Sequence, residues 1–363
     1  MNDKLSTFNK IMSIQEFLEI VVKEEASDLH LVVGMPAMIR IDGDLRPVSS
    51  GSLTPADTET LVFELLSPEQ KEMLLVNKEL DFSFALGEVA RFRVNAYYQK
   101  GYLSAALRLI PSYVKTIEEL NLPKICHNFS QMRQGFVLVA GPTGHGKSTT
   151  IASIINEINQ TRSVHIVTIE DPIEYVYPKG KSLVSQREMH LDTHSWEVAL
   201  RSALREDPDV VLVGEMRDFE TIAAAITIAE TGHLVFATLH TNSASQSIDR
   251  IIDVFPENQL LQVRMQLASI IAGIISIRLV PAIGGGRLPA TEVLLSSGAV
   301  ATAIREGKTH QIDNIIQTSG QSGMILLDAS LAYLVRAGRI SLDVARAYSI
   351  RPEELERLVG KAV

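Results

Sequence analysis

Cysteine is nearly absent from this sequence, because the 363 residues contain only one, Cys126. A single cysteine cannot form an internal disulfide, and it cannot supply a cysteine-rich zinc site. The lack of cross-links indicates a reducing compartment, so we expect a cytoplasmic protein. Cys126 itself is expected to be a buried packing residue rather than a reactive thiol.

An excess of basic residues is also missing. Asp and Glu number 43 against 34 Lys and Arg, which gives a formal net charge of −9. Proteins that bind along nucleic acids need clustered Lys and Arg to neutralise phosphates. The composition therefore argues against a nucleic-acid partner and against a helicase, and leaves room only for a local basic patch.

The sequence has no uninterrupted apolar run of the about 20 residues that span a bilayer. The most apolar stretch, 267–280, is broken by Arg278 and predicts a core helix that runs into a buried strand. Residues 1–13 lack the apolar core and the cleavage site of a signal peptide. We therefore expect neither a transmembrane segment nor export.

What is present are two regions with different patterns. Short strands and helices up to Ile110 indicate an α+β domain, whereas strands and helices alternate further along, which is typical of a parallel sheet covered by helices. A short helix is predicted at Ile117–Leu120. The predicted boundaries are 1–111 for the α+β domain, 112–119 for a linker, 120–297 for the α/β core and 298–363 for a helical C-terminal subdomain.

Residues 136–155, FVLVAGPTGHGKSTTIASII, carry an apolar run, a glycine-rich turn and a helix-compatible segment. The turn satisfies G-x-x-x-x-G-K-[ST] in a strand–loop–helix context. Because glycines let the backbone N–H groups point inward at a helix N-terminus, the loop can cradle a polyphosphate. The predicted nucleotide-binding residues are Gly141, Pro142, Thr143, Gly144, His145, Gly146, Lys147, Ser148 and Thr149.

Side chains of this loop have specific expected roles. Lys147 would reach the β- and γ-phosphates, the Ser148 hydroxyl would bind Mg²⁺, and Thr149 would steady the α-phosphate. His145 is expected to point outward. The alternative is a glycine-rich surface loop that matches the pattern by accident.

Acidic residues follow two further buried strands. Glu215 ends the run DVVLVGE, at the edge where ligands bind in open α/β sheets, and could polarise an attacking water directly or through Mg²⁺. The segment IEDPIE places three carboxylates within residues 170–174, and such acids repel one another unless a cation lies among them. Glu170 is the predicted Mg²⁺ residue there. A solvated strand end or turn is the alternative for both.

The run GHLVFATLH brackets one strand between His233 and His240. His240 follows the strand at the edge where Glu215 is expected, and imidazole can donate to a phosphate oxygen. We predict that His240 senses the γ-phosphate, with a purely structural histidine as the alternative. The histidines have no partners at metal-ligand spacing, so they predict no metal site.

Taken in order, GPTGHGKSTT, IEDPIEYVY, DVVLVGEMRD and GHLVFATLHTNSA resemble the Walker A, Asp-box, Walker B and His-box motifs of the secretion and pilus ATPase superfamily. The segments ASDLHLVVGMPAMIRIDGDLRPV, RFRVNAYYQKGYLSAALRLIP and AIREGKTHQIDNIIQTS are similar to PilT-type retraction ATPases of type IV pili. This similarity runs through nearly the whole chain.

The resemblance implies a ring-shaped homohexamer that binds ATP and Mg²⁺ between an N-terminal PAS-like domain and a RecA-like core. It also implies that N-terminal arginines approach the phosphates, which points to Arg93 and Arg108; a solvated sheet face is the alternative for these two. The implied catalytic residues are Glu215, Glu170, Lys147, Arg93, Arg108 and His240, and the implied metal-binding residues are Ser148, Glu170 and Glu215.

The implied activity is ATP hydrolysis that powers pilus retraction in twitching motility. The implied partners are an inner-membrane platform protein at the pilus base and a paralogous pilus ATPase. A PilU-type accessory retraction ATPase and a nucleotide-gated scaffold are the alternatives. The extension ATPase is disfavoured, because that branch is expected to carry a four-cysteine zinc motif.

Overall fold

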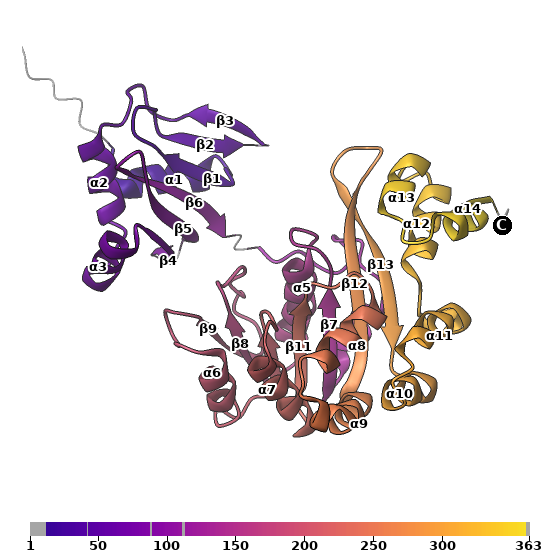
Figure 1. Ribbon diagram of the computed structural model, residues 1–363. Helices are drawn as coiled ribbons and strands as arrows, with labels where there is room; N and C mark the ends of the chain where they lie inside the picture. The colour runs from indigo at the N-terminus through magenta and orange to yellow at the C-terminus, as the bar shows by residue number, and fades with distance from the viewer. Residues whose placement is uncertain (1–11, 42, 88, 111–112, 361–363) are drawn as a thin grey trace, which may run out of the picture. The chain divides into compact units, whose positions relative to one another are not determined.

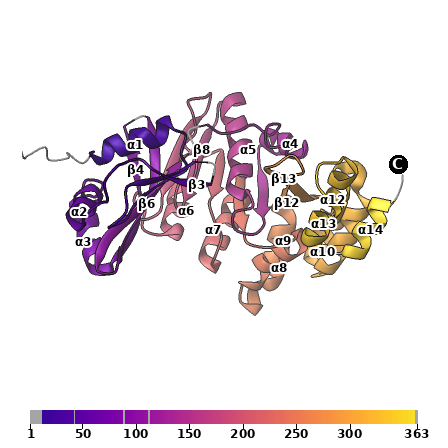
Figure 2. The ribbon, with the colours of Figure 1, turned by 90° about the horizontal axis from the view of Figure 1, so that it is seen from above.

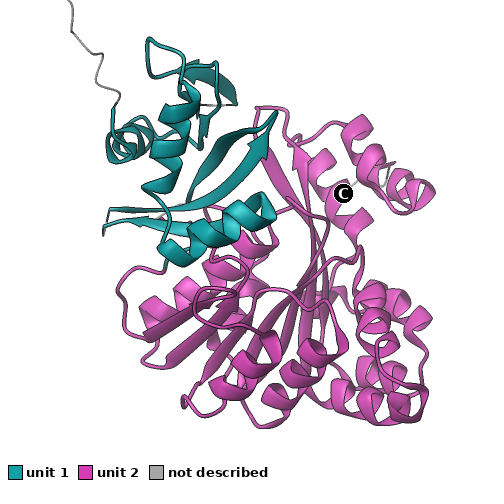
Figure 3. Cartoon of the chain, turned by 60° about the vertical axis from the view of Figure 1, so that its left-hand side comes forward, with its two compact units in different colours: residues 1–112, 174–176 teal, residues 113–173, 177–363 magenta. Residues whose placement is uncertain are grey.

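The structure, a computed structural model, describes residues 12–41, 43–87, 89–110 and 113–360. The chain forms two compact units (Figure 3). The first unit comprises residues 1–112 and 174–176, and the second unit comprises residues 113–173 and 177–363.

The first unit contains an antiparallel sheet with the strand order β3-β2-β1-β6-β5-β4. Its strands are β1 Asp28–Leu31, β2 Met38–Ile41, β3 Asp44–Pro47, β4 Glu79–Leu86, β5 Ala90–Gln99 and β6 Tyr102–Ile110. Its helices are α1 Ile14–Lys23, α2 Pro55–Phe63 and α3 Pro68–Asn77.

Local sequence explains where these elements begin and which face they bury. Helix α1 starts after Ser13 because Ser13 and Glu16 form a capping box, in which each side chain accepts from the other residue's backbone N–H. In β5, side chains alternate between the core and the opposite face, so Phe92 and Val94 are fully buried while Arg93 is exposed. One face of this sheet is therefore apolar and covered, and the other is polar.

The second unit contains a sheet with the order β13-β12-β7-β11-β10-β8-β9, in which β12 and β13 are antiparallel and all other neighbours are parallel. Its strands are β7 Gly135–Ala140, β8 His165–Glu170, β9 Leu183–Glu188, β10 Val210–Val213, β11 Leu234–Leu239, β12 Ile271–Pro281 and β13 Arg287–Leu295. The predicted mixed α/β fold with a parallel sheet is confirmed.

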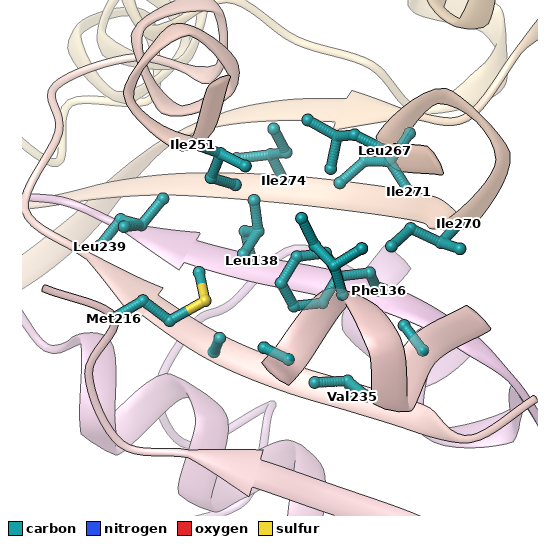
Figure 4. Packing of buried hydrophobic residues seen from close by; sticks show 14 of the residues in the cluster. Phe136, Leu138, Met216, Val235, Leu239, Ile251, Leu267, Ile270, Ile271 and Ile274 are labelled. Atoms are coloured by element: carbon teal, nitrogen blue, oxygen red, sulfur yellow. The ribbon is translucent and has the colours of Figure 1, made fainter. Parts of the chain in front are cut away.

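Helices cover both faces of this sheet (Figures 1 and 2). Phe136 and Leu138 of β7 pack on the face covered by α6 to α9, whereas Val137 and Val139 pack on the face covered by α4 and α5. Figure 4 shows Phe136 and Leu138 among the apolar side chains of the first face. The helices are α4 Ile125–Gln131, α5 Lys147–Thr161, α6 Trp196–Ala203, α7 Phe219–Glu230, α8 Ala244–Asp253 and α9 Leu260–Ile270, with a 3-10 turn η1 at Glu257–Gln259.

Burial on both faces explains the continuous apolar runs of the central strands. All four residues of β10 and all six of β11 are buried. Each fully buried Val, Leu or Phe contributes roughly 1.5–3 kcal/mol through removal of apolar surface from water. The central strands are therefore a rigid base, and whatever follows their carboxyl ends is held in a fixed position.

Beyond β13 the described residues are mostly helical (Figure 1). Helices α12 to α14 pack with β12 and β13 around a small apolar cluster of their own, which includes Val280, Leu331 and Leu355. The elements are α10 Gly298–Arg305, η2 Thr309–Gln311, α11 Ile312–Thr318, η3 Gly320–Ser322, α12 Leu327–Arg336, α13 Leu342–Tyr348 and α14 Pro352–Gly360.

Two local expectations can be compared with these elements, and one strand was not predicted. The apolar stretch 267–280 does form the end of helix α9 and the buried strand β12. The helix predicted at Ile117–Leu120 is wrong, because these residues form a turn and the next helix, α4, starts at Ile125. Strand β9 was missed, since its sequence LVSQRE is polar and half exposed at the sheet edge.

Among the described residues, no helix combines the length and apolarity that crossing a membrane requires.

Candidate active site at the carboxyl edge of the sheet

The glycine-rich loop lies between the buried strand β7 and helix α5. Gly144 and Gly146 have φ of 76° and 86°, in the left-handed region that side chains rarely adopt. A Cβ on Gly141 would lie 2.4 Å from the carbonyl oxygen of Ile277, so no other residue fits there. The loop therefore curls as the sequence predicted.

Lys147, the first residue of α5, is buried and turns back across this loop. Its Nζ donates to the carbonyl oxygens of Gly141 at 2.9 Å and Pro142 at 3.1 Å. The ammonium is thus held at the mouth of the loop, where phosphate oxygens could replace the two carbonyls as its partners.

Glu215 and His240 follow the neighbouring strands β10 and β11, and their side chains meet. His240 Nε2 lies 3.2 Å from Glu215 Oε1. His240 Nδ1 lies 3.3 Å from the Thr143 hydroxyl and 3.4 Å from Lys147 Nζ. Because the Lys147 ammonium can only donate, Nδ1 acts as the acceptor and the proton belongs on Nε2, which donates to Glu215.

Arg217 completes this group, since its Nη2 donates to Glu215 Oε2 at 2.8 Å. Burial alone would raise the pKa of Glu215, but the Arg217 hydrogen bond, the charge that His240 carries when protonated at acidic pH, and the charges of Arg217 and Lys147 outweigh it and lower that pKa. Burial lowers the pKa of His240, and the Lys147 charge lowers it further. At neutral pH the site therefore holds a carboxylate beside a neutral imidazole.

Glu170 ends strand β8, next to β10, and is held by neutral donors. Its Oε1 accepts from the Thr168 hydroxyl at 2.7 Å and from Gln186 Nε2 at 3.3 Å. Asp171 and Glu174, the other acids of the segment, are exposed. Glu170 is thus the one acid of the three that is buried and oriented, as its position nearest the strand suggested.

The donor set can be tested against Mg²⁺. Among the described residues, no group of three or more His, Cys, Asp or Glu side chains could enclose a metal ion. Mg²⁺ does not need such a group, because it keeps several waters and binds one or two carboxylates together with substrate phosphates. The half-buried Ser148, with Glu170 and Glu215 at neighbouring strand ends, fits that pattern.

His145 does not point outward, so that expectation is wrong. Its side chain is half-buried, and its Nδ1 accepts from the backbone N–H of Leu279 in β12 at 3.0 Å. Ser148 and Thr149, which follow in α5, are also half-buried.

Arg93 and Arg108 lie in the first unit, directly opposite each other on β5 and β6. Both are exposed, and Arg108 Nε donates to Asp28 Oδ1 at 2.9 Å. Asp28 in turn lies opposite both Arg108 and Arg40 in the strand register, so the four side chains form one charged row across the sheet. The role of Arg93 and Arg108 toward phosphates stays a prediction.

Sequence reasoning missed four residues that orient the predicted ones. Arg217 lies two positions after Glu215, so its proximity was available from the sequence. Thr168 is likewise two positions before Glu170 on the same strand face. Gln186 and Asp28 lie on strands whose pairing the sequence does not reveal.

A parallel sheet with a phosphate-binding loop after one strand and acids after its neighbours defines a P-loop protein of the α/β class. The chain belongs to the family described as type II/IV secretion system protein, whose model matches residues 4–287. The resemblance stated from the motifs is thereby confirmed at the level of the family.

Individual relatives agree with this. The chain is 48% identical to the type IV pilus retractation ATPase PilT of Pseudomonas aeruginosa, over 94% of this chain and 99% of that protein. It is 37% identical to the type IV pilus ATPase PilU of the same species, over 96% and 91% of the two chains. Its structure is similar to the crystal structure of the pilus retraction motor PilT with bound ADP, with a TM-score of 0.89, 47% identity and coverage of 95% of this chain and 99% of that one.

Proposed function

We propose that this protein hydrolyses ATP to drive retraction of type IV pili. The observation that supports this most directly is the contact of His240 with Lys147 of the phosphate loop on one side and with Glu215 on the other. Such a bridge allows a change at the loop to reach the acid that would activate water. The similarity to the pilus ATPases PilT and PilU supports type IV pili as the structures on which the proposed motor acts.

The nucleotide would be held by residues 141–149, with the loop N–H groups and Lys147 on its phosphates. Mg²⁺ bound at Ser148, with Glu170 and Glu215 in reach of its hydration shell, would neutralise developing charge on the phosphates. Glu215 would orient the attacking water and accept its proton through Oε1 or Oε2. Its lowered pKa favours the ionised form that this role requires at neutral pH.

The wider assembly rests on the family resemblance. We propose a homohexamer in which a PAS-like domain, residues 1–111, closes on a neighbouring RecA-like core, residues 120–297, when ATP binds. Arg93 and Arg108 would then stabilise the transition state only in the closed form, so closure would be coupled to hydrolysis. The ring would act in the cytoplasm on a platform protein of the inner membrane, with residues 112–119 as the linker and 298–363 as a helical subdomain.

A phosphate-release assay tests the enzymatic part of the proposal. We expect steady turnover of Mg·ATP by the wild type and loss of that turnover in Glu215→Ala. Turnover no higher than that of the variant would favour the nucleotide-gated scaffold.

Deletion of the encoding gene tests the biological part. We expect pili that are retained on the surface and do not retract, whereas loss of surface pili would point to an assembly motor. The 37% identity to PilU keeps an accessory retraction ATPase as the second candidate. That role predicts that a paralogous ATPase still retracts pili after the deletion.

A further inference from the structure

The side chain of one loop residue, His145, joins the phosphate loop to the neighbouring strand, and the proposed function gives that side chain no separate role. Strands β7 and β12 run parallel, and their pairing ends with Ala140 opposite Ser276. Here the chain of β7 turns away to form the loop, while β12 continues as far as Pro281. The last part of β12 therefore extends beyond the end of its β7 partner.

His145 supplies a partner in the place that β7 has left. Three residues beyond the last pair, the N–H of Leu279 donates to His145 Nδ1 at 3.0 Å. On the other side of β12, Leu279 lies opposite Pro289 of β13. A half-buried backbone donor that loses a partner costs free energy, so this contact stabilises the loop against the sheet.

Three further contacts join the loop to the β12–β13 hairpin and both of these to helix α13. The Arg287 side chain of β13 donates to the carbonyl oxygen of Gly144 in the loop at 3.3 Å. The His145 and Tyr348 rings have centroids 6.3 Å apart, and Arg278 of β12 donates to the Tyr348 carbonyl oxygen at 2.8 Å. The loop, the β12–β13 hairpin and helix α13 are thus mutually connected.

We propose that His145 is a positioning residue that fixes the curled form of the phosphate loop by accepting the Leu279 N–H. This inference rests on the proposed function in one respect, because the loop is taken to bind a nucleotide. A loop already held in its binding form loses less conformational freedom when a ligand arrives, so the contact strengthens nucleotide binding.

The protonation state of His145 agrees with the role of acceptor. Burial lowers its pKa, and the positive charges of Arg278 on β12, Arg287 on β13 and Lys147 on α5 lower it further. The imidazole is therefore neutral at neutral pH, with Nδ1 free of a proton and Nε2 carrying it.

The chemistry of the contact suggests a matched pair of variants. An asparagine places its Oδ1 close to where the histidine places Nδ1, so His145→Asn keeps an acceptor for the Leu279 N–H, whereas His145→Ala removes it. His233→Ala is the control, because His233 is also half-buried and bonded to a backbone carbonyl, that of Ile228, but lies at the opposite end of the sheet.

Two measurements are made on the full-length protein: hydrogen–deuterium exchange of peptides that contain Leu279, without nucleotide, and the Kd for Mg·ADP. In His145→Ala we expect about three- to tenfold faster exchange and about three- to tenfold weaker binding, as loss of one hydrogen bond allows. His145→Asn is expected to stay within about twofold of wild type in both, and so is His233→Ala.

The inference is overturned if exchange at Leu279 is unchanged in His145→Ala, or if His145→Asn exchanges as fast as the alanine variant. Faster exchange with unchanged binding would also overturn it, because the contact would then not position the loop. Wild-type protein that bound no Mg·ADP would count against the proposed function instead, and the exchange comparison would still decide whether His145 holds the loop.

Discussion

The two edges of the second unit's sheet carry similar residues with different partners. At the carboxyl edge, His240 contacts the side chains of Thr143, Lys147 and Glu215. At the amino edge, backbone groups are among the partners: His165 Nδ1 is 2.9 Å from the Glu206 carbonyl oxygen, although its Nε2 is 2.9 Å from the Ser185 hydroxyl, and Asp209 accepts from the His165 N–H at 2.8 Å. His233 Nδ1, at the amino end of β11, lies 3.0 Å from the Ile228 carbonyl oxygen and 3.0 Å from the Thr231 hydroxyl.

This difference separates structural from functional polar groups. A side chain bonded to the backbone satisfies a group that would otherwise be left unpaired at a strand end, so its partner is fixed by the fold. Two side chains bonded to each other, as His240 and Glu215 are, can exchange partners with a ligand without breaking the backbone ladder. The His240–Glu215 pair at the carboxyl edge is thus suited to a change of partner, whereas His165 and His233 at the amino edge stabilise backbone groups.

The largest effect should come from removing the acid at the carboxyl edge. In Glu215→Gln we expect kcat to fall about 100- to 1,000-fold, as for loss of a general base, with the Kd for Mg·ADP nearly unchanged. Phosphate release and equilibrium nucleotide binding measure the two quantities.

The matched variant at the amino edge is Asp209→Asn. It weakens the bond to the His165 N–H, so it should destabilise the fold by about 1 kcal/mol and leave kcat within about twofold. An Asp209→Asn enzyme that had lost turnover while keeping its melting temperature would refute the distinction between the two edges.

Glu170→Gln should have the next largest effect, about 10- to 100-fold on kcat, because one of the acids proposed to face Mg²⁺ would become neutral. If Glu170 acts through the metal, a higher Mg²⁺ concentration should recover part of the lost activity. Titration of Mg²⁺ at saturating ATP measures this. An unchanged Mg²⁺ requirement would mean that Glu170 only completes the hydrogen bonds of Thr168 and Gln186.

Sequence patterns predicted the positions of these groups better than their contacts. Buried runs placed Glu170, Glu215 and His240 after adjacent strands, since strand ends in a parallel sheet meet at one edge. The sequence could not show that Arg217 and His240 occupy both oxygens of Glu215, because rotamers depend on packing. The expectation that His145 points outward was wrong for a similar reason. His145 contacts the part of β12 that extends beyond β7, and the length of that part depends on the register of two strands far apart in the sequence.

A smaller effect should come from pH. Because the pKa of His240 is lowered from 6.5, the unfolded chain binds more protons than the folded chain just below that value, so stability rises with pH through this window. Protonation of Nδ1 would also replace its role as acceptor for Thr143 with repulsion from Lys147. We expect kcat to fall at a pH below the ordinary histidine pKa, because the pKa of His240 is lowered, and this acid limb should be absent from His240→Asn, whatever its residual rate.

The smallest effect is expected where the same substitution is made at the other end of β11. His233→Asn shortens the reach to the Ile228 carbonyl oxygen, which would cost about 0.5–1.5 kcal/mol and lower the melting temperature by a few degrees. Its pH–rate profile should overlay that of the wild type, because no reacting group lies at this edge. Calorimetry and pH–rate profiles of His233→Asn and His240→Asn therefore compare the effects of the same substitution at the two ends of strand β11. A changed acid limb in His233→Asn would mean that the amino edge also communicates with the site.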